Sequence, residues 1–259
     1  MKKQDAAFRS PSQKMSRADE LTVRLGLAPS RSAAQHLIRN GNVLAGDSPV
    51  RKPSQMLPDD TLLSIQENTE IYVSRGAGKL LAAIKAFSPS IEGKVALDLG
   101  ASTGGFTEVL LRNGAAKVYA VDVGTGQLHP SLRADSRVVS LENTNARDLN
   151  AKIIPEKIQI LTGDLSFISL TKVLPACSGL LADGFMAMLL VKPQFEADRK
   201  DIGSGGVVRN PDVRLKCVEK IVAFAEEDLG WHHIGTVPSP VLGQNGNQEY
   251  MLAFEGRSQ

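Results

Sequence analysis

A glycine-rich turn follows a short apolar segment near the middle of the chain. The segment Val95–Asp98 has the composition of a buried strand, and the turn that contains Gly100, Gly104 and Gly105 leads into a helix-like run. Such a turn lets the backbone approach a ligand closely at the carboxyl edge of a sheet, and the start of the helix favours a negative group. These residue types and their order predict a small-molecule site.

The spacing of the glycines narrows the class of ligand. The pattern is G-x-x-x-G-G, whereas a dinucleotide site has G-x-G-x-x-G and a phosphate loop ends in Gly-Lys followed by Ser or Thr. The spacing therefore argues against NAD and against ATP.

A lysine at the end of a second apolar segment also needs an explanation. Lys192 follows Met188–Val191, and Asp164 follows another apolar segment, residues 158–163. Because burial of an unpaired ammonium group is costly, Lys192 either reaches solvent or pairs with a carboxylate. A solvated lysine explains this segment equally well. If both segments are parallel strands, Lys192 and Asp164 share the edge at which α/β sheets place their chemistry.

The elements that would position these residues alternate between strands and helices beyond Gly76. Apolar segments predict parallel strands near 94–98, 117–122, 158–163 and 186–191. A helix near 211–228 precedes two further strands, 231–239 and 248–255, which we expect to pair antiparallel at one edge of the sheet. The fold class is therefore α/β.

The first part of the chain is more basic than the rest. Residues 1–52 carry ten Lys and Arg against four Asp and Glu, within a net charge of +2 for the 259 residues. We predict a basic tail over 1–13, a small α+β domain over 14–66, a linker over 67–75 and the catalytic domain over 76–259. A domain of about fifty residues has a small core and suits the presentation of a surface, here to an acidic polymer.

The bulk composition excludes several classes of protein. No segment reaches the roughly 18 apolar residues of a membrane span, and the N-terminus lacks the apolar core of a signal peptide. Cys177 and Cys217 have neither metal-type nor redox-type spacing, so we interpret both as reduced core thiols. We expect a cytoplasmic protein that needs neither a metal nor a membrane.

The glycine turn and the acids around it resemble the S-adenosylmethionine site of Rossmann-like methyltransferases. The resemblance implies that Asp98 lies near the methionine amino group, that Asp122 binds the ribose hydroxyls and that Asp148 accepts from the adenine amino group. Each acid alone is more often an ordinary strand-end or turn residue, but their joint order favours the cofactor. The turn residues that the resemblance assigns to cofactor binding are Gly100, Ser102, Thr103, Gly104, Gly105 and Phe106.

Longer motifs match one family of RNA methyltransferases. They are Ser74–Leu80, Asp98–Thr107, Asp164–Ser169, Lys192–Glu196, Gly205–Arg209 and Gly243–Tyr250. On these motifs the chain resembles the TlyA family, also associated with hemolysin A, whose catalytic half is FtsJ-like. The resemblance implies a Rossmann-like class I methyltransferase with a mostly parallel seven-stranded sheet. It places a catalytic tetrad on Lys79, Asp164, Lys192 and Glu249.

The reaction that the resemblance implies is methyl transfer to a ribose 2′-hydroxyl of cytidine in 16S ribosomal RNA, 23S ribosomal RNA or both. That hydroxyl is a poor nucleophile at neutral pH, so the protein must orient it and help to remove its proton. Lys192 is the candidate for both tasks. A neighbouring Lys79 would favour the neutral amine of Lys192, whereas Asp164 and Glu249 would oppose that change.

Two departures from the family pattern precede the glycine turn. The chain has Gly76-Ala77-Gly78 where the family usually has a Gly-Gly pair before the lysine. It also has Glu70, Ile71 and Tyr72 where some relatives carry an Arg and a Trp. We expect a local difference in backbone path and in the coupling of the two domains.

The N-terminal domain supplies the RNA side of the prediction. Residues 30–46 include an amphipathic helix entered at Ser30 and, with Lys52–Ser54, are similar to the RNA-binding module of a small-subunit ribosomal protein. Contacts to phosphates position RNA without reading its sequence, although each cation alone is more often an ordinary surface residue. The cations predicted to contact RNA, in ribosomal subunits or free, are Arg17, Arg31, Arg39, Lys52, Arg75 and Arg133.

Aromatic residues are few, so the shape of folded RNA is the expected target of recognition. Phe195, and after it Phe167, are candidates for stacking on a flipped base, although either residue would also fit a core.

Other functions fit parts of the sequence. An RNA base amino-methyltransferase carries Asn/Asp-Pro-Pro-Tyr/Phe where this chain has Asp164–Phe167 without the prolines. A cysteine-dependent base methyltransferase needs Cys177 or Cys217 at a strand end beside the site. A non-catalytic ribosome-binding factor would keep the fold without using the tetrad. Direct membrane lysis is not expected, because no apolar span or membrane-type amphipathic helix is evident.

Overall fold

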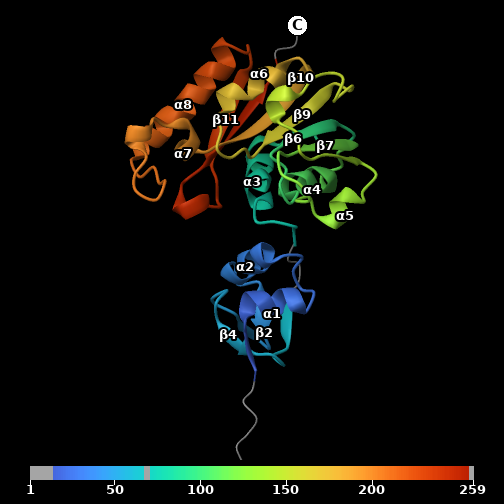
Figure 1. The fold of residues 1–259 in the computed structure, drawn as a ribbon, viewed down its shortest axis with the longest axis vertical. Helices are drawn as coiled ribbons and strands as arrows, with labels where there is room; N and C mark the ends of the chain where they lie inside the picture. The colour runs from blue at the N-terminus through green and yellow to red at the C-terminus, as the bar shows by residue number, and fades with distance from the viewer. Residues whose placement is uncertain (1–13, 67–70, 257–259) are drawn as a thin grey trace, which may run out of the picture. The chain divides into compact units, whose positions relative to one another are not determined.

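The computed structural model describes residues 14–66 and 71–256, which form two compact units that divide between Ile71 and Tyr72 (Figure 1). The basic tail predicted over 1–13 lies outside the described residues, as do residues 67–70 of the predicted linker.

The first unit contains two helices and two small sheets. Strand β1 pairs with β4, and β2 lies between β3 and β5. The elements in chain order are β1 (Met15–Arg17), α1 (Ala18–Arg24), α2 (Arg31–Arg39), β2 (Val43–Ala45), β3 (Ser48–Pro49), β4 (Met56–Pro58) and β5 (Leu63–Ile65).

Helix α2 begins where the sequence predicts. The side chain of Ser30 accepts a hydrogen bond from the backbone N–H of Ala33, which satisfies one of the free donors of the first turn. The buried face of α2 packs on Leu21 of α1 and Val43 of β2 in one small core. The unit thus has the small core that its length predicts.

A buried carboxylate ties the two helices of this unit together. Asp19 on α1 is fully buried and accepts hydrogen bonds from Arg17, from Arg31 and from Gln35 on α2. Burial alone would raise the pKa of Asp19, but the hydrogen bonds from Arg17, Gln35 and Arg31 outweigh it and hold the pKa well below its usual range. Asp19 is therefore a carboxylate at neutral pH.

The second unit is an α/β domain built on one seven-stranded sheet, as predicted. The strand order is β11-β12-β10-β9-β6-β7-β8, and only β12 runs against its neighbours. The strands are β6 (Val95–Leu99), β7 (Lys117–Val121), β8 (Val138–Leu141), β9 (Ile158–Gly163), β10 (Leu181–Val191), β11 (His232–Pro238) and β12 (Tyr250–Glu255).

Helices and short turns connect these strands. The α-helices are α3 (Ala77–Phe87), α4 (Gly105–Arg112), α5 (Pro130–Arg133), α6 (Leu174–Ser178), α7 (Pro193–Glu196) and α8 (Pro211–Glu227). Four turns of 3₁₀-helix are η1 (Ala146–Asp148), η2 (Leu170–Lys172), η3 (Arg199–Asp201) and η4 (Gln244–Gly246). Among the described residues, no helix is long and apolar enough to cross a membrane.

Two strands differ from the sequence prediction. β10 begins at Leu181 rather than near 186, and its pairing with β9 shifts register between Leu181 and Met186. Exposed residues in this interval interrupt the apolar run, so the run does not indicate where the strand begins. β8 was not among the predicted strands; it is only four residues long, so its apolar run is short.

The sheet has an apolar core on each face. Leu97 and Leu189 point to a core that includes Trp231, whereas their neighbours Ala96 and Met188 point to a second core. Alternation of this kind is what a strand buried on both faces requires. The carboxyl ends of β10, β9, β6 and β7 lie side by side at one edge, which brings the residues that follow them together.

We expect Asp19→Asn to destabilise the first unit by about 2 kcal/mol at pH 7, because a buried acceptor of two partly exposed arginines loses its charge. Since the pKa of Asp19 is lowered by folding, this contribution is present above about pH 4 and is lost as the pH falls further. Amide hydrogen exchange in α1 and α2 of the full chain measures it. Asp47→Asn, at an exposed turn, is the control; equal protection in both variants at pH 7 would contradict this role.

Candidate active site

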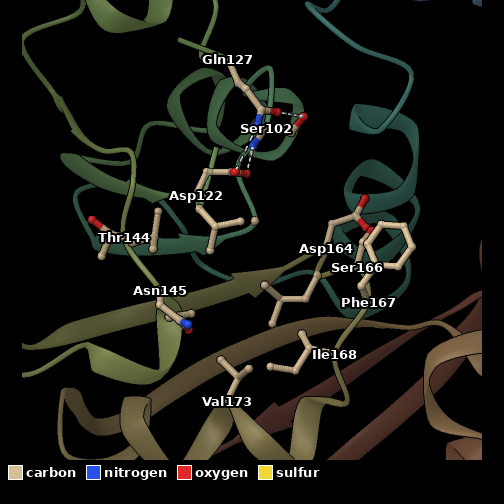
Figure 2. Close-up of a pocket in the computed structure, with 15 residues that line it drawn as sticks. Ser102, Asp122, Gln127, Thr144, Asn145, Asp164, Ser166, Phe167, Ile168 and Val173 are labelled. Carbon is tan, nitrogen blue, oxygen red and sulfur yellow. Dashed lines mark hydrogen bonds between the residues drawn. The ribbon is translucent and has the colours of Figure 1, made fainter. Parts of the chain in front are cut away.

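A cavity of about 400 Å³ opens at the carboxyl ends of β6, β7, β8 and β9 (Figure 2). Its volume is typical of a small-molecule site, and so is its position at the sheet edge. The residues whose side chains or backbone line it are Gly100, Ser102, Val121, Asp122, Val123, Gln127, Thr144, Asn145, Ala146, Asp164, Leu165, Ser166, Phe167, Ile168 and Val173.

The glycine turn after β6 forms one wall of the cavity. Gly100 has φ +75°, and a Cβ atom at this position would lie 2.8 Å from the backbone oxygen of Asp164. Gly104 has φ +98°, and a Cβ atom there would lie 2.2 Å from the side chain of Leu132. The turn therefore needs glycine at both positions, for backbone conformation and for space.

Asp122 is fixed at the mouth of the cavity. Its carboxylate accepts a hydrogen bond from the backbone N–H of Ser102 at 2.8 Å (Figure 2). It accepts another from the backbone N–H of Gly124 at 2.7 Å. These donors come from the turn after β6 and from the loop after β7. Both loops therefore fix the position of this acid in the wall of the cavity.

Asp98 lies beneath the glycine turn and is fully buried. One carboxyl oxygen accepts from Thr107 of α4 at 2.7 Å and the other from Thr162 of β9 at 3.0 Å. Burial raises the pKa of Asp98 to about 7, against the opposing hydrogen bonds of the two threonines. Asp98 thus ties β6, α4 and β9 together and is not among the residues that line the cavity.

The structure brings part of the predicted cofactor set to the cavity. Gly100, Ser102 and Asp122 line it, and Asn145 lines it in place of Asp148, which is exposed on η1. The predicted residues that do not line it are Asp98, Thr103, Gly104, Gly105, Phe106 and Asp148.

Several residues that line the cavity were not predicted from the sequence. Gln127 follows Gly124 and Gly126 in the loop after β7, and Thr144 and Asn145 follow β8, which was not predicted as a strand. Asn145 lies in the same short segment as Asp148, and an amide oxygen accepts hydrogen bonds as a carboxylate does. A search that admitted amides as well as acids after the third strand would have included it.

The four residues of the predicted tetrad meet beside the cavity. They come from the first turn of α3, the ends of β9 and β10, and the segment before β12. Lys79 Nζ lies 2.8 Å from Glu249 Oε2 and 3.1 Å from Asp164 Oδ2. Lys192 Nζ lies 2.6 Å from Asp164 Oδ1. The charges therefore alternate in the order Lys192, Asp164, Lys79, Glu249.

Most of the tetrad is shielded from solvent. Lys79, Lys192 and Glu249 are 7%, 8% and 1% exposed, so each charge depends on its partners for compensation. Burial alone would raise the pKa of Asp164, but the charges of Lys79 and Lys192 outweigh it and lower the pKa. Asp164 is thus an ionised link between the two lysines.

Two further polar side chains extend the tetrad. Lys192 donates to Ser166 Oγ at 2.7 Å, and Ser166 also lines the cavity. Gln194 donates to Glu249 Oε1 at 3.1 Å. The head of Lys192 is therefore held between Asp164 and a residue of the cavity wall, and the motifs alone gave no reason to select Ser166.

An aromatic pair stands next to the tetrad. Phe167 is 82% exposed, and its ring centroid lies 5.0 Å from that of Phe195. A groove of about 430 Å³ runs beside the pair and is lined by Arg147, Phe167, Ile168, Ser169, Lys172 and Phe195. Arg147 and Lys172 form no ion pair with the acids of the described residues, and neither was selected from the sequence.

The cations that the sequence selected differ in their surroundings. Arg17 and Arg31 pair with Asp19, and Arg133 pairs with Glu142. The selected cations that are exposed and have no ion pair within the described residues are Arg39, Lys52 and Arg75.

Both cysteines are buried. Burial raises the pKa of Cys177 to about 12 and that of Cys217 to about 11, so neither is a thiolate at neutral pH. Within residues 14–66 and 71–256, no three His, Cys, Asp or Glu side chains gather as a metal site would require.

Comparisons with known proteins find similarity over both units. Residues 72–256 match the FtsJ-like methyltransferase family, and residues 16–61 match the S4 domain. A Mycobacterium tuberculosis protein named 16S/23S rRNA (cytidine-2'-O)-methyltransferase TlyA is 48% identical over 91% of this chain and 88% of its own. Hemolysin A of Brachyspira hyodysenteriae is 40% identical over 92% of this chain and 99% of its own. A solved structure of a hemolysin-named protein from Streptococcus thermophilus has a TM-score of 0.73 at 40% identity, covering 95% of this chain and 90% of that one.

We expect Asp98→Asn to change how the stability of the second unit depends on pH. Because folding raises the pKa of Asp98 to about 7, its contribution is fully present below about pH 4 and is lost as the pH rises to 7. Relative to the wild type, the variant should therefore gain roughly 3 kcal/mol between pH 4 and pH 8. Chemical denaturation across this range measures the gap. Asp183→Asn, at an exposed position, is the control; parallel curves for wild type and Asp98→Asn would refute the assignment.

Proposed function

The chain belongs to the TlyA family of FtsJ-like methyltransferases, and from this membership we propose that it transfers a methyl group from S-adenosylmethionine to a ribose 2′-hydroxyl of ribosomal RNA. One observation supports the proposal most strongly. The charges of Lys192, Asp164, Lys79 and Glu249 alternate in sign, largely shielded from solvent, beside a small-molecule cavity. The Mycobacterium tuberculosis relative is named for cytidine in 16S and 23S ribosomal RNA, and a Campylobacter jejuni relative for cytidine in 23S, so cytidine is the nucleotide that we propose here.

The cavity has the properties that the cofactor would need. Asp122 would accept hydrogen bonds from its ribose hydroxyls, and the close backbone of Gly100 leaves room for it. Asn145 and Asp148 are the candidates for its adenine amino group. Asp98 would act on its methionine end from beneath the turn formed by residues 100–106. When bound, the cofactor supplies a methyl group already activated by a positive sulfur.

Lys192 would orient the 2′-hydroxyl and, in its neutral amine form, take the proton that the hydroxyl loses. Asp164 and Ser166 each hold the Nζ atom of Lys192, which leaves its remaining position for the acceptor hydroxyl. Lys79 shares the carboxylate of Asp164 with Lys192. Glu249 compensates Lys79 from the other side.

RNA would contact both units through cations and aromatic rings. In the first unit we assign phosphate contacts to Arg39 and Lys52, and to the exposed N–H groups of Arg17 and Arg31. In the second unit the candidates are Arg75, Arg133, Arg147 and Lys172. Phe195 with Phe167 forms an exposed aromatic surface beside Lys192, where a base next to the reacting ribose would stack. Because ribosomes are its substrate in this proposal, we infer a cytoplasmic location.

One alternative has a specific observation in its favour. The loop Asp164–Phe167 places an exposed aromatic ring next to the cavity, as an amino-methyltransferase would to hold a target base. The buried Lys192 argues for the ribose instead, because an amino group does not need a proton acceptor as a hydroxyl does.

The test of the proposal is transfer of radiolabelled methyl from S-adenosylmethionine to purified small and large ribosomal subunits. Label in an alkali-resistant dinucleotide is the expected result, because a 2′-O-methyl group blocks alkaline cleavage. Label in a base would support the amino-methyltransferase, and absence of label with retained ribosome binding would support a non-catalytic binding factor.

We expect Lys192→Ala to lower kcat by roughly 10³-fold, because a positioned proton acceptor contributes about that much. The Kd for S-adenosylmethionine should change by less than about twofold, since Lys192 does not line the cavity. Lys192→Arg should also be inactive, because guanidinium stays protonated. Lys152→Ala, at an exposed lysine, is the control. Loss of cofactor binding together with activity would contradict the role of Lys192 as proton acceptor.

A further inference from the structure

Two loops carry most of the chemistry, and both follow neighbouring strands. The loop after β9 spans residues 164–170, and the turn after β10 spans residues 192–196. At one end they are joined by the ion pair between Lys192 and Asp164, and farther along by the ring contact of Phe195 with Phe167. A third connection lies beyond the rings and is made by Glu196.

Glu196 ends α7 and is 6% exposed. Its Oε2 atom accepts from Ser169 Oγ at 2.6 Å, and its Oε1 atom accepts from the backbone N–H of Leu170 at 2.8 Å. Both donors belong to the loop after β9. One carboxylate thus closes the two loops on each other at the end opposite to the tetrad.

A purely structural role explains this carboxylate poorly. Its cation, Lys220 on α8, lies 3.4 Å from Oε2 and is half-exposed, and it makes a shorter bond of 3.0 Å to the backbone oxygen of Glu196. A buried carboxylate with one loose cation costs desolvation energy that an apolar side chain of similar size would avoid. The two short bonds to the neighbouring loop are what the charge provides.

The loop between these two connections includes a strained residue. Phe167 has φ +62°, a left-handed conformation that is uncommon for an aromatic residue and costs about 1–3 kcal/mol. Its ring is 82% exposed, so burial contributes little to hold it there. The conformation therefore depends on the fixed ends of the loop, Asp164 at one and Ser169 at the other.

We propose that Glu196 is a positioning residue for methyl transfer. By holding Ser169 and the N–H of Leu170, it fixes the loop after β9 against the turn after β10, and so sets Ser166 and Phe167 relative to Lys192. The inference rests on the proposed function, because it takes the tetrad to be the catalytic machinery. Glu196 lines neither the cavity nor the groove beside the aromatic pair, so it acts through other residues.

The experiment compares Glu196→Ala, Glu196→Gln and the wild type in methyl transfer to ribosomal subunits. Glu196→Ala should lower kcat about 10- to 100-fold, the loss that a displacement of about 1 Å gives. The KM for ribosomal subunits and the Kd for S-adenosylmethionine should each stay within about threefold. Glu196→Gln keeps an acceptor for Leu170 and should recover part of kcat. Asp198→Asn, two residues on and paired only loosely with Lys200, is the matched control.

A second measurement does not depend on activity. In Glu196→Ala, amide hydrogen exchange of residues 165–170 should become faster, while β9 and β10 keep their protection. Wild-type protein that transfers no methyl group overturns the proposed function and leaves this measurement readable.

Three results would overturn the role of Glu196. They are unchanged exchange in residues 165–170, a kcat of Glu196→Ala within twofold of the wild type, and a loss of cofactor affinity as large as the loss of kcat. A double variant with Ser169→Ala provides a further check, because its kcat should fall no further than that of Glu196→Ala. Additive losses would count against the shared contact.

Discussion

The second unit depends on four charges that alternate in sign and are mostly buried. Lys192, Lys79 and Glu249 are buried and Asp164 is partly buried, so each charge gains its compensation from the next. Because the four come from separate segments of the chain, the pairing is possible only when α3, β9, β10 and the segment before β12 all reach one point. The requirement to neutralise these charges therefore constrains the loops as firmly as the apolar cores constrain the strands.

The strand order makes that meeting possible. β10 lies between β9 and β12, so the residues after β9 and β10 and those before the reversed strand β12 share one edge. Antiparallel β12 is needed here, because only its start can lie beside the ends of the parallel strands. Gly243 adds a local condition, since a Cβ atom at this position would lie 2.0 Å from Glu249 Oε1. The small residue leaves the carboxylate free to face Lys79.

Sequence patterns predicted the strands that have long apolar runs and the residues whose charge is unexpected at the end of such a run. β6, β7 and β9 were predicted within a residue or two, and Lys192 drew attention as a cation at the end of a buried strand. The apolar run of β8 is only four residues long, and exposed residues interrupt the start of β10, so neither forms a long apolar run. Pairing partners such as Asp19 with Arg31, or Glu196 with Ser169, could not be predicted, because they depend on contacts between segments far apart in sequence.

The two aspartates at neighbouring strand ends show how partners decide the state of a buried acid. Asp164 faces two ammonium groups and its pKa is lowered, whereas Asp98 faces two hydroxyls and its pKa is raised to about 7. The ionised Asp164 itself adds to the rise at Asp98. A cation held near the glycine turn would favour ionisation of Asp98, and by linkage an ionised Asp98 would favour that cation. The proposed cofactor is positively charged at both its sulfur and its amino group, so its binding near the turn would favour the ionised form of Asp98.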